Sequence, residues 1–127
     1  MKLEHIALSV KSTVEIEAFY KGLLGMEEVR NFVLNENLAK RIFGIQQKTA
    51  VVLLQKEDLV LEVFLSAEPL KKSFNHICIA VTDREKLVKV ANHNNYEVIQ
   101  IKRDYSDLIF IKDNSRNTFE IKEITTD

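Results

Sequence analysis

Two stretches of the sequence, LEHIALSVKS at residues 3–12 and FNHICIAVTD at residues 74–83, align with each other without a gap. Each begins with an apolar residue, a polar residue and a His-Ile pair, runs through small and apolar residues to a valine, and ends at a residue that commonly caps a helix. The copies are 71 residues apart, which is too far for the stacked repeats of a solenoid. We therefore interpret the chain as two copies of one module.

A helix is predicted after the first strand of each copy, because apolar residues there recur at helical spacing. In the first copy, Ser12 and Glu15 match a capping box, and Gly25 supplies the left-handed residue that ends the helix. In the second copy, Asp83 caps the helix, and an asparagine at position 94 or 95 takes the place of the glycine. Both copies are thus predicted to begin with a strand that is followed by a helix.

Three strand-like runs follow each helix, separated by short polar turns. Each copy is therefore β-α-β-β-β, and the fold class is α+β. We expect one domain over residues 1–127, with the first module at about 1–68 and the second at about 73–125. The predicted strands are MEEVRNFVL (26–34), TAVVLLQ (49–55), LVLEVFL (59–65), YEVIQIK (96–102), DLIFIK (107–112) and TFEIKEI (118–124).

The first copy carries an insertion that the second lacks. His5 and Glu62 are 57 residues apart, whereas His76 and Glu120 are 44 apart, so 13 extra residues lie around ENLAKRIFGIQQK at 36–48. The apolar residues of this segment are spaced like a short amphipathic helix that ends near a glycine. Two interpretations stay open: a surface loop with one packed turn, or a lid or dimer contact over the site.

Each copy places one histidine and one glutamate on otherwise apolar strands. Because strand side chains alternate between faces, His5 and His76 on the first strands and Glu62 and Glu120 on the last strands all point away from the helices. A lone ionised carboxylate such as Glu62 is costly to bury unless it is paired, protonated or bound to a metal. Imidazole and carboxylate together suit Zn²⁺, Ni²⁺, Co²⁺, Fe²⁺ or Mn²⁺. The four residues therefore predict one divalent metal site.

Composition excludes several other classes of function. The net charge is −1 with both signs interspersed, so neither a nucleic acid nor a membrane is an expected partner. The start of the chain has no signal-peptide core, and we expect a cytoplasmic protein. Cys78 is the only cysteine, which rules out an intrachain disulfide. No glycine-rich phosphate motif is present, and we expect no organic cofactor.

The paired modules, the strings HIALSV, HICIAV and AFYKGLLGMEE, and the four metal-ligand residues resemble the vicinal oxygen chelate superfamily. This superfamily includes glyoxalase I, methylmalonyl-CoA epimerase, extradiol dioxygenases, and the fosfomycin and bleomycin resistance proteins. The resemblance covers nearly the whole chain. It implies that the two modules form a cupped, barrel-like mixed sheet around the metal, with helices outside, and that the chain forms a homodimer.

The ligand order His5, Glu62, His76, Glu120 is similar to that of bacterial-type glyoxalase I, whose metal is Ni²⁺ or Zn²⁺. The resemblance implies a lyase or isomerase, similar to lactoylglutathione lyase, that transfers a proton on a metal-chelated hydroxycarbonyl or thiohemiacetal. Glu120 is the preferred base, with Glu62 on the opposite side of the substrate. The alternatives are a small-molecule binding or sequestering protein of the same fold, and a metal-dependent epimerase or dioxygenase.

Two departures from the pattern concern the substrate. The second copy usually ends in a turn similar to DPDGN, but this chain has KDNSRN at 112–117, which keeps Asp113 and lacks the proline and glycine. Glyoxalase I usually has an arginine on the first strand that helps to hold glutathione, near the place of Ser9. These changes leave the fold and metal set intact and weaken the case for a glutathione-linked substrate.

Overall fold

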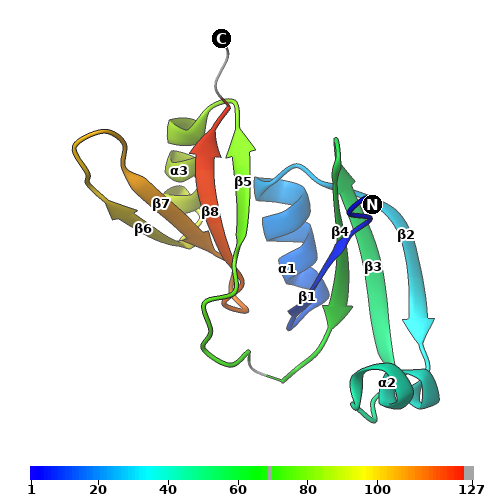
Figure 1. Cartoon of the computed structure of the whole chain (residues 1–127). Helices are drawn as coiled ribbons and strands as arrows, with labels where there is room; N and C mark the ends of the chain where they lie inside the picture. The colour runs from blue at the N-terminus through cyan, green and yellow to red at the C-terminus, as the bar shows by residue number, and fades with distance from the viewer. Residues whose placement is uncertain (69, 125–127) are drawn as a thin grey trace. The chain divides into compact units, whose positions relative to one another are not determined.

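The structure is a computed structural model of the 127-residue chain, and it describes residues 1–68 and 70–124. The chain separates into two compact units, residues 1–69 and 70–127 (Figure 1). Each unit contains the predicted β-α-β-β-β order, and the first has one additional helix. The α+β fold class with paired modules is therefore confirmed. Residue 125, where we predict the second module to end, lies outside the described residues.

The first unit is a four-stranded sheet in the order β1-β4-β3-β2. Strands β1 and β4 are parallel, and the other neighbours are antiparallel. The helix after β1 starts as α1 and continues as a π-helix, η1. The elements are β1 (Ile6–Val10), α1 (Thr13–Glu15), η1 (Ile16–Leu23), β2 (Glu27–Leu34), α2 (Glu36–Phe43), β3 (Thr49–Lys56) and β4 (Leu59–Leu65).

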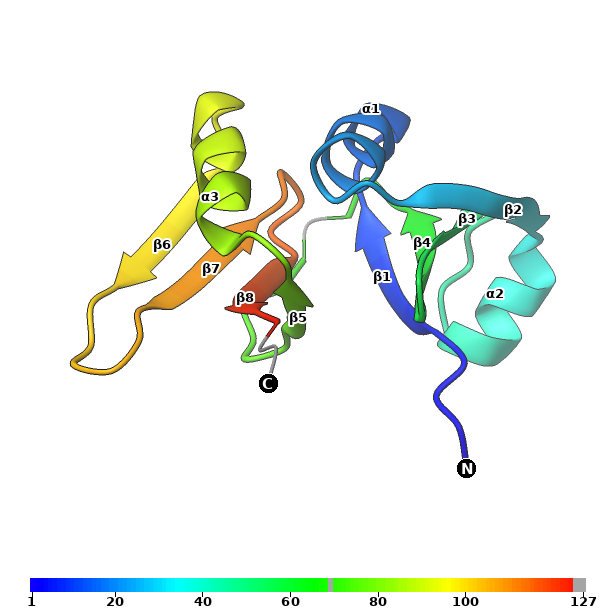
Figure 2. The same ribbon diagram turned by 90° about the horizontal axis from the view of Figure 1, so that it is seen from above.

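The second unit repeats this topology in the order β5-β8-β7-β6, again with a parallel pair, β5 and β8, at one edge. Its elements are β5 (Ile77–Val81), α3 (Arg84–His93), β6 (Glu97–Ile101), β7 (Leu108–Lys112) and β8 (Thr118–Glu123). Figure 2 shows α3 lying across one face of this sheet. No helix among residues 1–68 and 70–124 is long and apolar enough to cross a membrane.

The core of each unit lies between its sheet and the helix that follows its first strand. In the first unit, Leu61 and Val63 of β4 are fully buried together with Phe19 and Tyr20 of the helix. In the second unit, the matching residues of β8, Phe119 and Ile121, are buried with Ala91 of α3. The predicted inward faces of the last strands are thus confirmed, and the opposite faces are left for other contacts.

Helix ends follow the predictions with one exception. The Asp83 side chain accepts a hydrogen bond from a first-turn N–H of α3 at 3.0 Å. Gly25 (φ 72°) and Asn95 (φ 63°) adopt the left-handed conformation that stops the helices. The predicted capping box is wrong at Ser12, whose side chain makes no cap hydrogen bond. Its backbone carbonyl accepts the Glu15 N–H at 3.2 Å instead.

The turn between β7 and β8 is organised by the carboxylate of Asp113, which is only 4% exposed. It accepts hydrogen bonds from the Ser115 N–H at 2.9 Å, the Asn117 N–H at 2.8 Å and the Asn117 side-chain amide at 2.8 Å. Arg116 has φ 74° at the place of the missing glycine. The turn therefore keeps a glycine-like backbone without glycine.

The insertion forms a real helix. The Asn35 side chain caps α2 by accepting the Leu38 N–H at 2.8 Å, and Gly44 (φ 72°) ends it. The Phe43 ring packs edge-on against Phe64, with 5.5 Å between ring centroids. Phe64 shares the face of Glu62 on β4, so α2 lies on the sheet face opposite the buried helix (Figure 2). The insertion is therefore a packed helix on the Glu62 face of the sheet, and its role as a lid or dimer contact stays a prediction.

Candidate metal centre

In the first unit, the parallel pairing of β1 and β4 brings a histidine and a glutamate together. Ala7 of β1 lies in register with Glu62 of β4, and His5, two residues earlier, shares the face of Ala7. The His5 Nε2 atom is 3.7 Å from Glu62 Oε2. The histidine side chain is 42% exposed and the glutamate 18%, so the pair lies at the surface of the unit with the carboxylate partly sheltered.

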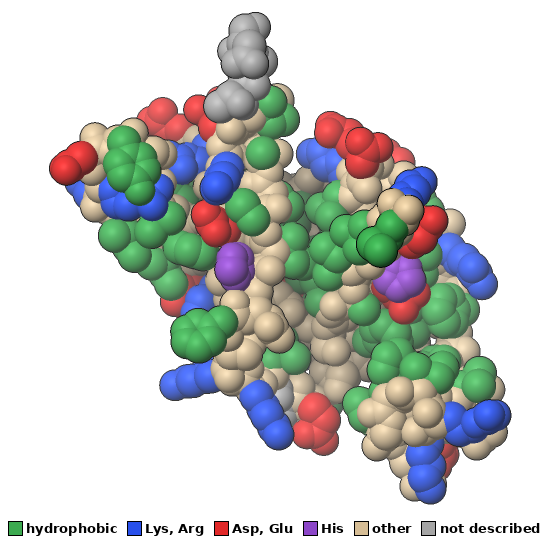
Figure 3. Space-filling view, viewed as in Figure 1, with side chains coloured by type: hydrophobic (Ala, Val, Ile, Leu, Met, Phe, Trp, Pro, Cys, Tyr) green, Lys and Arg blue, Asp and Glu red, His purple; other side chains and the backbone are tan. Residues whose placement is uncertain are grey.

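The second unit builds the same arrangement from its own parallel pair. Cys78 of β5 is in register with Glu120 of β8, and His76 comes two residues before Cys78. His76 Nε2 is 3.4 Å from Glu120 Oε1, and the side chains are 43% and 18% exposed. Figure 3 shows a histidine with acidic atoms beside it on the surface of each unit. The duplication of the sequence is therefore a duplication of the site geometry.

One backbone contact selects the nitrogen of His76 that can bind a metal. The Nδ1 atom is 2.9 Å from the carbonyl oxygen of Phe74. Because a carbonyl only accepts, Nδ1 carries the proton, and the lone pair is left on Nε2. Nε2 is the atom that faces Glu120. Metal-binding histidines are commonly oriented by such a hydrogen bond, which the ring nitrogen that does not bind the metal donates.

The spacing within each pair suits two ligands of one ion. Ligands that lie about 2.0–2.2 Å from a common metal, at an angle of about 90–110°, stand roughly 3.0–3.5 Å apart. The measured 3.4 Å and 3.7 Å are at or slightly beyond this range. Within residues 1–68 or 70–124, no three His, Cys, Asp or Glu side chains form a metal-binding group. Joining His5, Glu62, His76 and Glu120 around one ion stays a prediction.

Small residues flank both carboxylates on the parallel strands: Ala7 beside Glu62 and Cys78 beside Glu120. Cys78 is exposed in its unit. Partial desolvation of its sulfur nevertheless raises the pKa of the Cys78 thiol, the negative charge of Glu120 raises it further, and the positive charge of Lys122 opposes these effects. A raised thiol pKa argues against a role of Cys78 as nucleophile.

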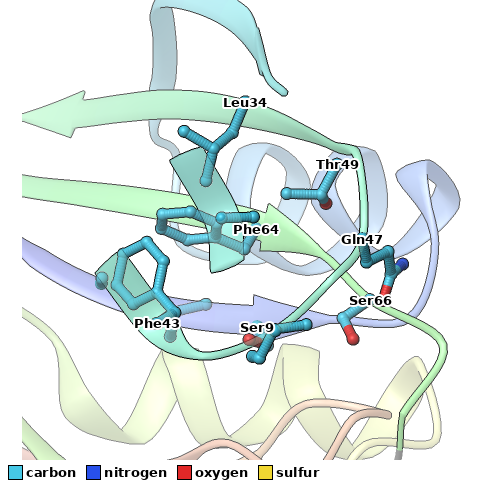
Figure 4. A pocket seen from close by; sticks show the side chains of 11 residues that line it. Ser9, Leu34, Phe43, Gln47, Thr49, Phe64 and Ser66 are labelled. Carbon is cyan, nitrogen blue, oxygen red and sulfur yellow. The ribbon is translucent and has the colours of Figure 1, made fainter. Parts of the chain in front are cut away.

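The first unit also contains a pocket of about 200 Å³ between its sheet and α2 (Figure 4). Ala7 and Ser9 of β1, Phe64 of β4 and Phe43 of α2 contribute to its lining. The sequence analysis predicted the insertion but did not predict this pocket. Strand alternation could have indicated it, because Ala7, Ser9 and Phe64 lie on the same sheet face as His5 and Glu62.

Solved structures share the fold over almost the whole chain. The genomically encoded fosfomycin resistance protein FosX from Listeria monocytogenes superposes with a TM-score of 0.75 at 16% identity, covering 98% of this chain and 94% of that one. A glyoxalase family protein from Enterococcus faecalis gives 0.72 at 19% identity, with coverages of 96% and 97%. A glutamate-to-glutamine mutant of the Listeria protein, complexed with Mn(II) and 1S,2S-dihydroxypropylphosphonic acid, gives 0.73 at 17%, with coverages of 98% and 93%.

Sequence comparison identifies the family. A search of curated proteins finds no significant match to this chain. A family model described as the glyoxalase/bleomycin resistance protein/dioxygenase superfamily matches residues 4–110, which include His5, Glu62, His76 and most of both modules. The expected resemblance to the vicinal oxygen chelate proteins is thereby confirmed. The chain belongs to the glyoxalase/bleomycin resistance protein/dioxygenase superfamily.

Proposed function

We propose that the protein is a metal-dependent lyase or isomerase of glyoxalase type. The observation that supports it is the repeated pair, His5 with Glu62 and His76 with Glu120, at 3.7 Å and 3.4 Å. These four residues would hold one divalent ion, with Ni²⁺ or Zn²⁺ preferred and Co²⁺, Fe²⁺ or Mn²⁺ as alternatives. When bound, such an ion supplies Lewis-acid polarisation of two neighbouring oxygens of a small substrate.

Glu120 is the proposed base. Its carboxylate is partly sheltered, with Cys78 on one neighbouring strand and Phe110 on the other. It takes a proton from the carbon next to the substrate carbonyl and returns it to the adjacent carbon, so the reaction has no redox change. Glu62 occupies the equivalent place in the first unit, in register with Ala7 and paired with His5.

The side chains around the first pair favour a substrate without glutathione. Ser9, at the place where glyoxalase I usually has an arginine, lines the pocket beside Glu62. A hydroxyl group cannot pair with the carboxylates of the tripeptide as a guanidinium does. Methylglyoxal adducts of small thiols are therefore the first substrates to test. Fosfomycin is a second, because similar folds occur among fosfomycin resistance proteins.

The test is exchange of the substrate α-proton with solvent deuterium on protein loaded with metal. Glu120→Gln should lower the exchange rate about 10²–10⁴-fold, as expected for loss of a general base. Substrate affinity should change much less, because the proton transfer acts in the transition state. Glu97→Gln, an exposed glutamate on β6 of the same unit, is the matched control and should keep the wild-type rate.

A different result of the exchange experiment would refute the proposed catalysis. If wild-type protein with bound metal exchanges no proton in any adduct and leaves fosfomycin intact, yet binds one such ligand tightly, catalysis is refuted. The same fold would then serve as a binding or sequestering protein.

A further inference from the structure

We propose that the pocket of the first unit binds an uncharged, apolar substituent of the substrate, about the size of a phenyl ring. This inference rests on the proposed function, which assigns the end of the substrate that binds the metal. It adds a substrate class: an oxygen-rich head at the His5–Glu62 pair, joined to an apolar tail under α2.

The pocket begins directly beside the candidate metal ligand. Ala7, which lines it, is in register with Glu62 on the neighbouring strand, and such strands lie about 4.8 Å apart. Ser9 and Phe64, also in the lining, are in register with each other two residues farther along. Two residues of a strand span about 7 Å. A group attached close to the oxygens bound at this pair would therefore reach the pocket.

Helix α2 covers one side of the pocket, and Figure 4 shows its Phe43 beside Phe64 of β4. Ala39 of α2 is 3% exposed and also lines the pocket, so a small residue there preserves the space. The insertion thus gives the first unit an apolar pocket beside its His–Glu pair, and among residues 70–124 the second unit has no helix at the corresponding place between β6 and β7.

The chemistry of the lining selects the tail. Among the described residues that line the pocket there is no Lys, Arg, Asp, Glu or His, and the polar side chains are hydroxyls and one amide. The Thr49 hydroxyl already donates to the Leu65 carbonyl. A charged group would lose water there without gaining a partner of opposite charge. An apolar cavity of about 150 Å³ in another protein holds benzene, so about 200 Å³ accommodates a phenyl or branched alkyl group.

The first experiment needs no metal. Benzyl alcohol, titrated into the full-length protein without metal, should shift the NMR signals of the Leu34, Ala39 and Ile45 methyl groups. The anionic 4-(hydroxymethyl)benzoate should bind at least about tenfold more weakly, because its carboxylate would be desolvated. Absence of benzyl alcohol binding, shifts confined to other residues, or equal affinity for both probes would overturn the inference.

Variants locate the binding. Ala39→Leu fills the pocket and should abolish the shifts, while Ala80→Leu, at an exposed alanine on β5, should not. Phe43→Ala enlarges the pocket without adding bulk to the core, and it should shift the preference toward 2-naphthylmethanol. Phe43→Ala tests the same pocket if Ala39→Leu does not fold. If both size changes leave ligand preference at the wild-type value, the pocket is not the binding site.

The second experiment separates this inference from the proposed function. On metal-loaded protein, benzohydroxamate should bind about 30-fold more tightly than acetohydroxamate, from burial of the phenyl area. Equal affinities with metal bound would refute the pocket and keep the metal site. If no metal binds, but benzyl alcohol binding depends on Ala39, the proposed function fails and the apolar pocket stands.

Discussion

Replacing Asp113 with alanine should destabilise the second unit strongly, although this residue is not a predicted metal ligand. Its carboxylate holds the turn between β7 and β8 through two backbone N–H groups and one side-chain amide. Because β8 carries Glu120, the turn also sets where the last strand starts. Alanine removes all three acceptor contacts without adding bulk.

The size of the loss follows from the two backbone contacts. Hydrogen bonds to a charged group contribute about 1.5–3 kcal/mol each, and two together give about 3–6 kcal/mol. Ser115 is buried, so its N–H finds no water in place of Asp113. The Asn117 N–H is only partly buried, so water can recover some of its contribution. We therefore expect a loss near the lower end of the range, about 3 kcal/mol.

Urea unfolding followed by far-UV circular dichroism measures this difference. Asp58→Ala changes an exposed aspartate in the corresponding turn between β3 and β4, and it should cost less than about 0.5 kcal/mol. Asp113→Asn keeps one acceptor oxygen and should lie between the two. A loss below about 1 kcal/mol for Asp113→Ala, or one equal to that of the control, would refute this account of the turn.

Four further predictions follow from other features. Arg116→Gly should stabilise the protein by about 1 kcal/mol, because glycine adopts φ 74° without strain; lower stability in the same urea assay would contradict this. Elemental analysis should find about one divalent ion per chain, largely lost in His76→Ala, and full retention in the double variant with His5→Ala would exclude the site. Glu120→Gln removes a charge that raises the pKa of Cys78, so alkylation by iodoacetamide should become faster at a given alkaline pH, and an unchanged pH profile would count against it. Light scattering should show a two-fold homodimer that covers the sheet edges; a metal-bound monomer at micromolar concentration would refute it.

Much of the fold could be predicted because its signals are local. Strand alternation and helical spacing depend on neighbours a few residues away, and the predicted strand at 59–65 matches β4 at both ends. The left-handed stop of the second helix could be narrowed to Asn94 or Asn95, because few residues besides glycine adopt that conformation readily, and the structure places it at Asn95. The predicted Ser12 cap was wrong because the Glu15 N–H can donate either to the Ser12 side chain or to the Ser12 backbone carbonyl, and the sequence pattern is the same in both cases.

The two modules, the face of each polar residue, and the choice of His and Glu as candidate ligands could all be inferred from local sequence pattern. The tertiary structure adds that His5 meets Glu62 and His76 meets Glu120, because parallel strand pairing joins residues far apart in the chain. It also decided that α2 packs over the Glu62 face and leaves a pocket there. An amphipathic pattern shows that a helix must bury one side. The surface that it packs against depends on how the strands are arranged in the folded sheet.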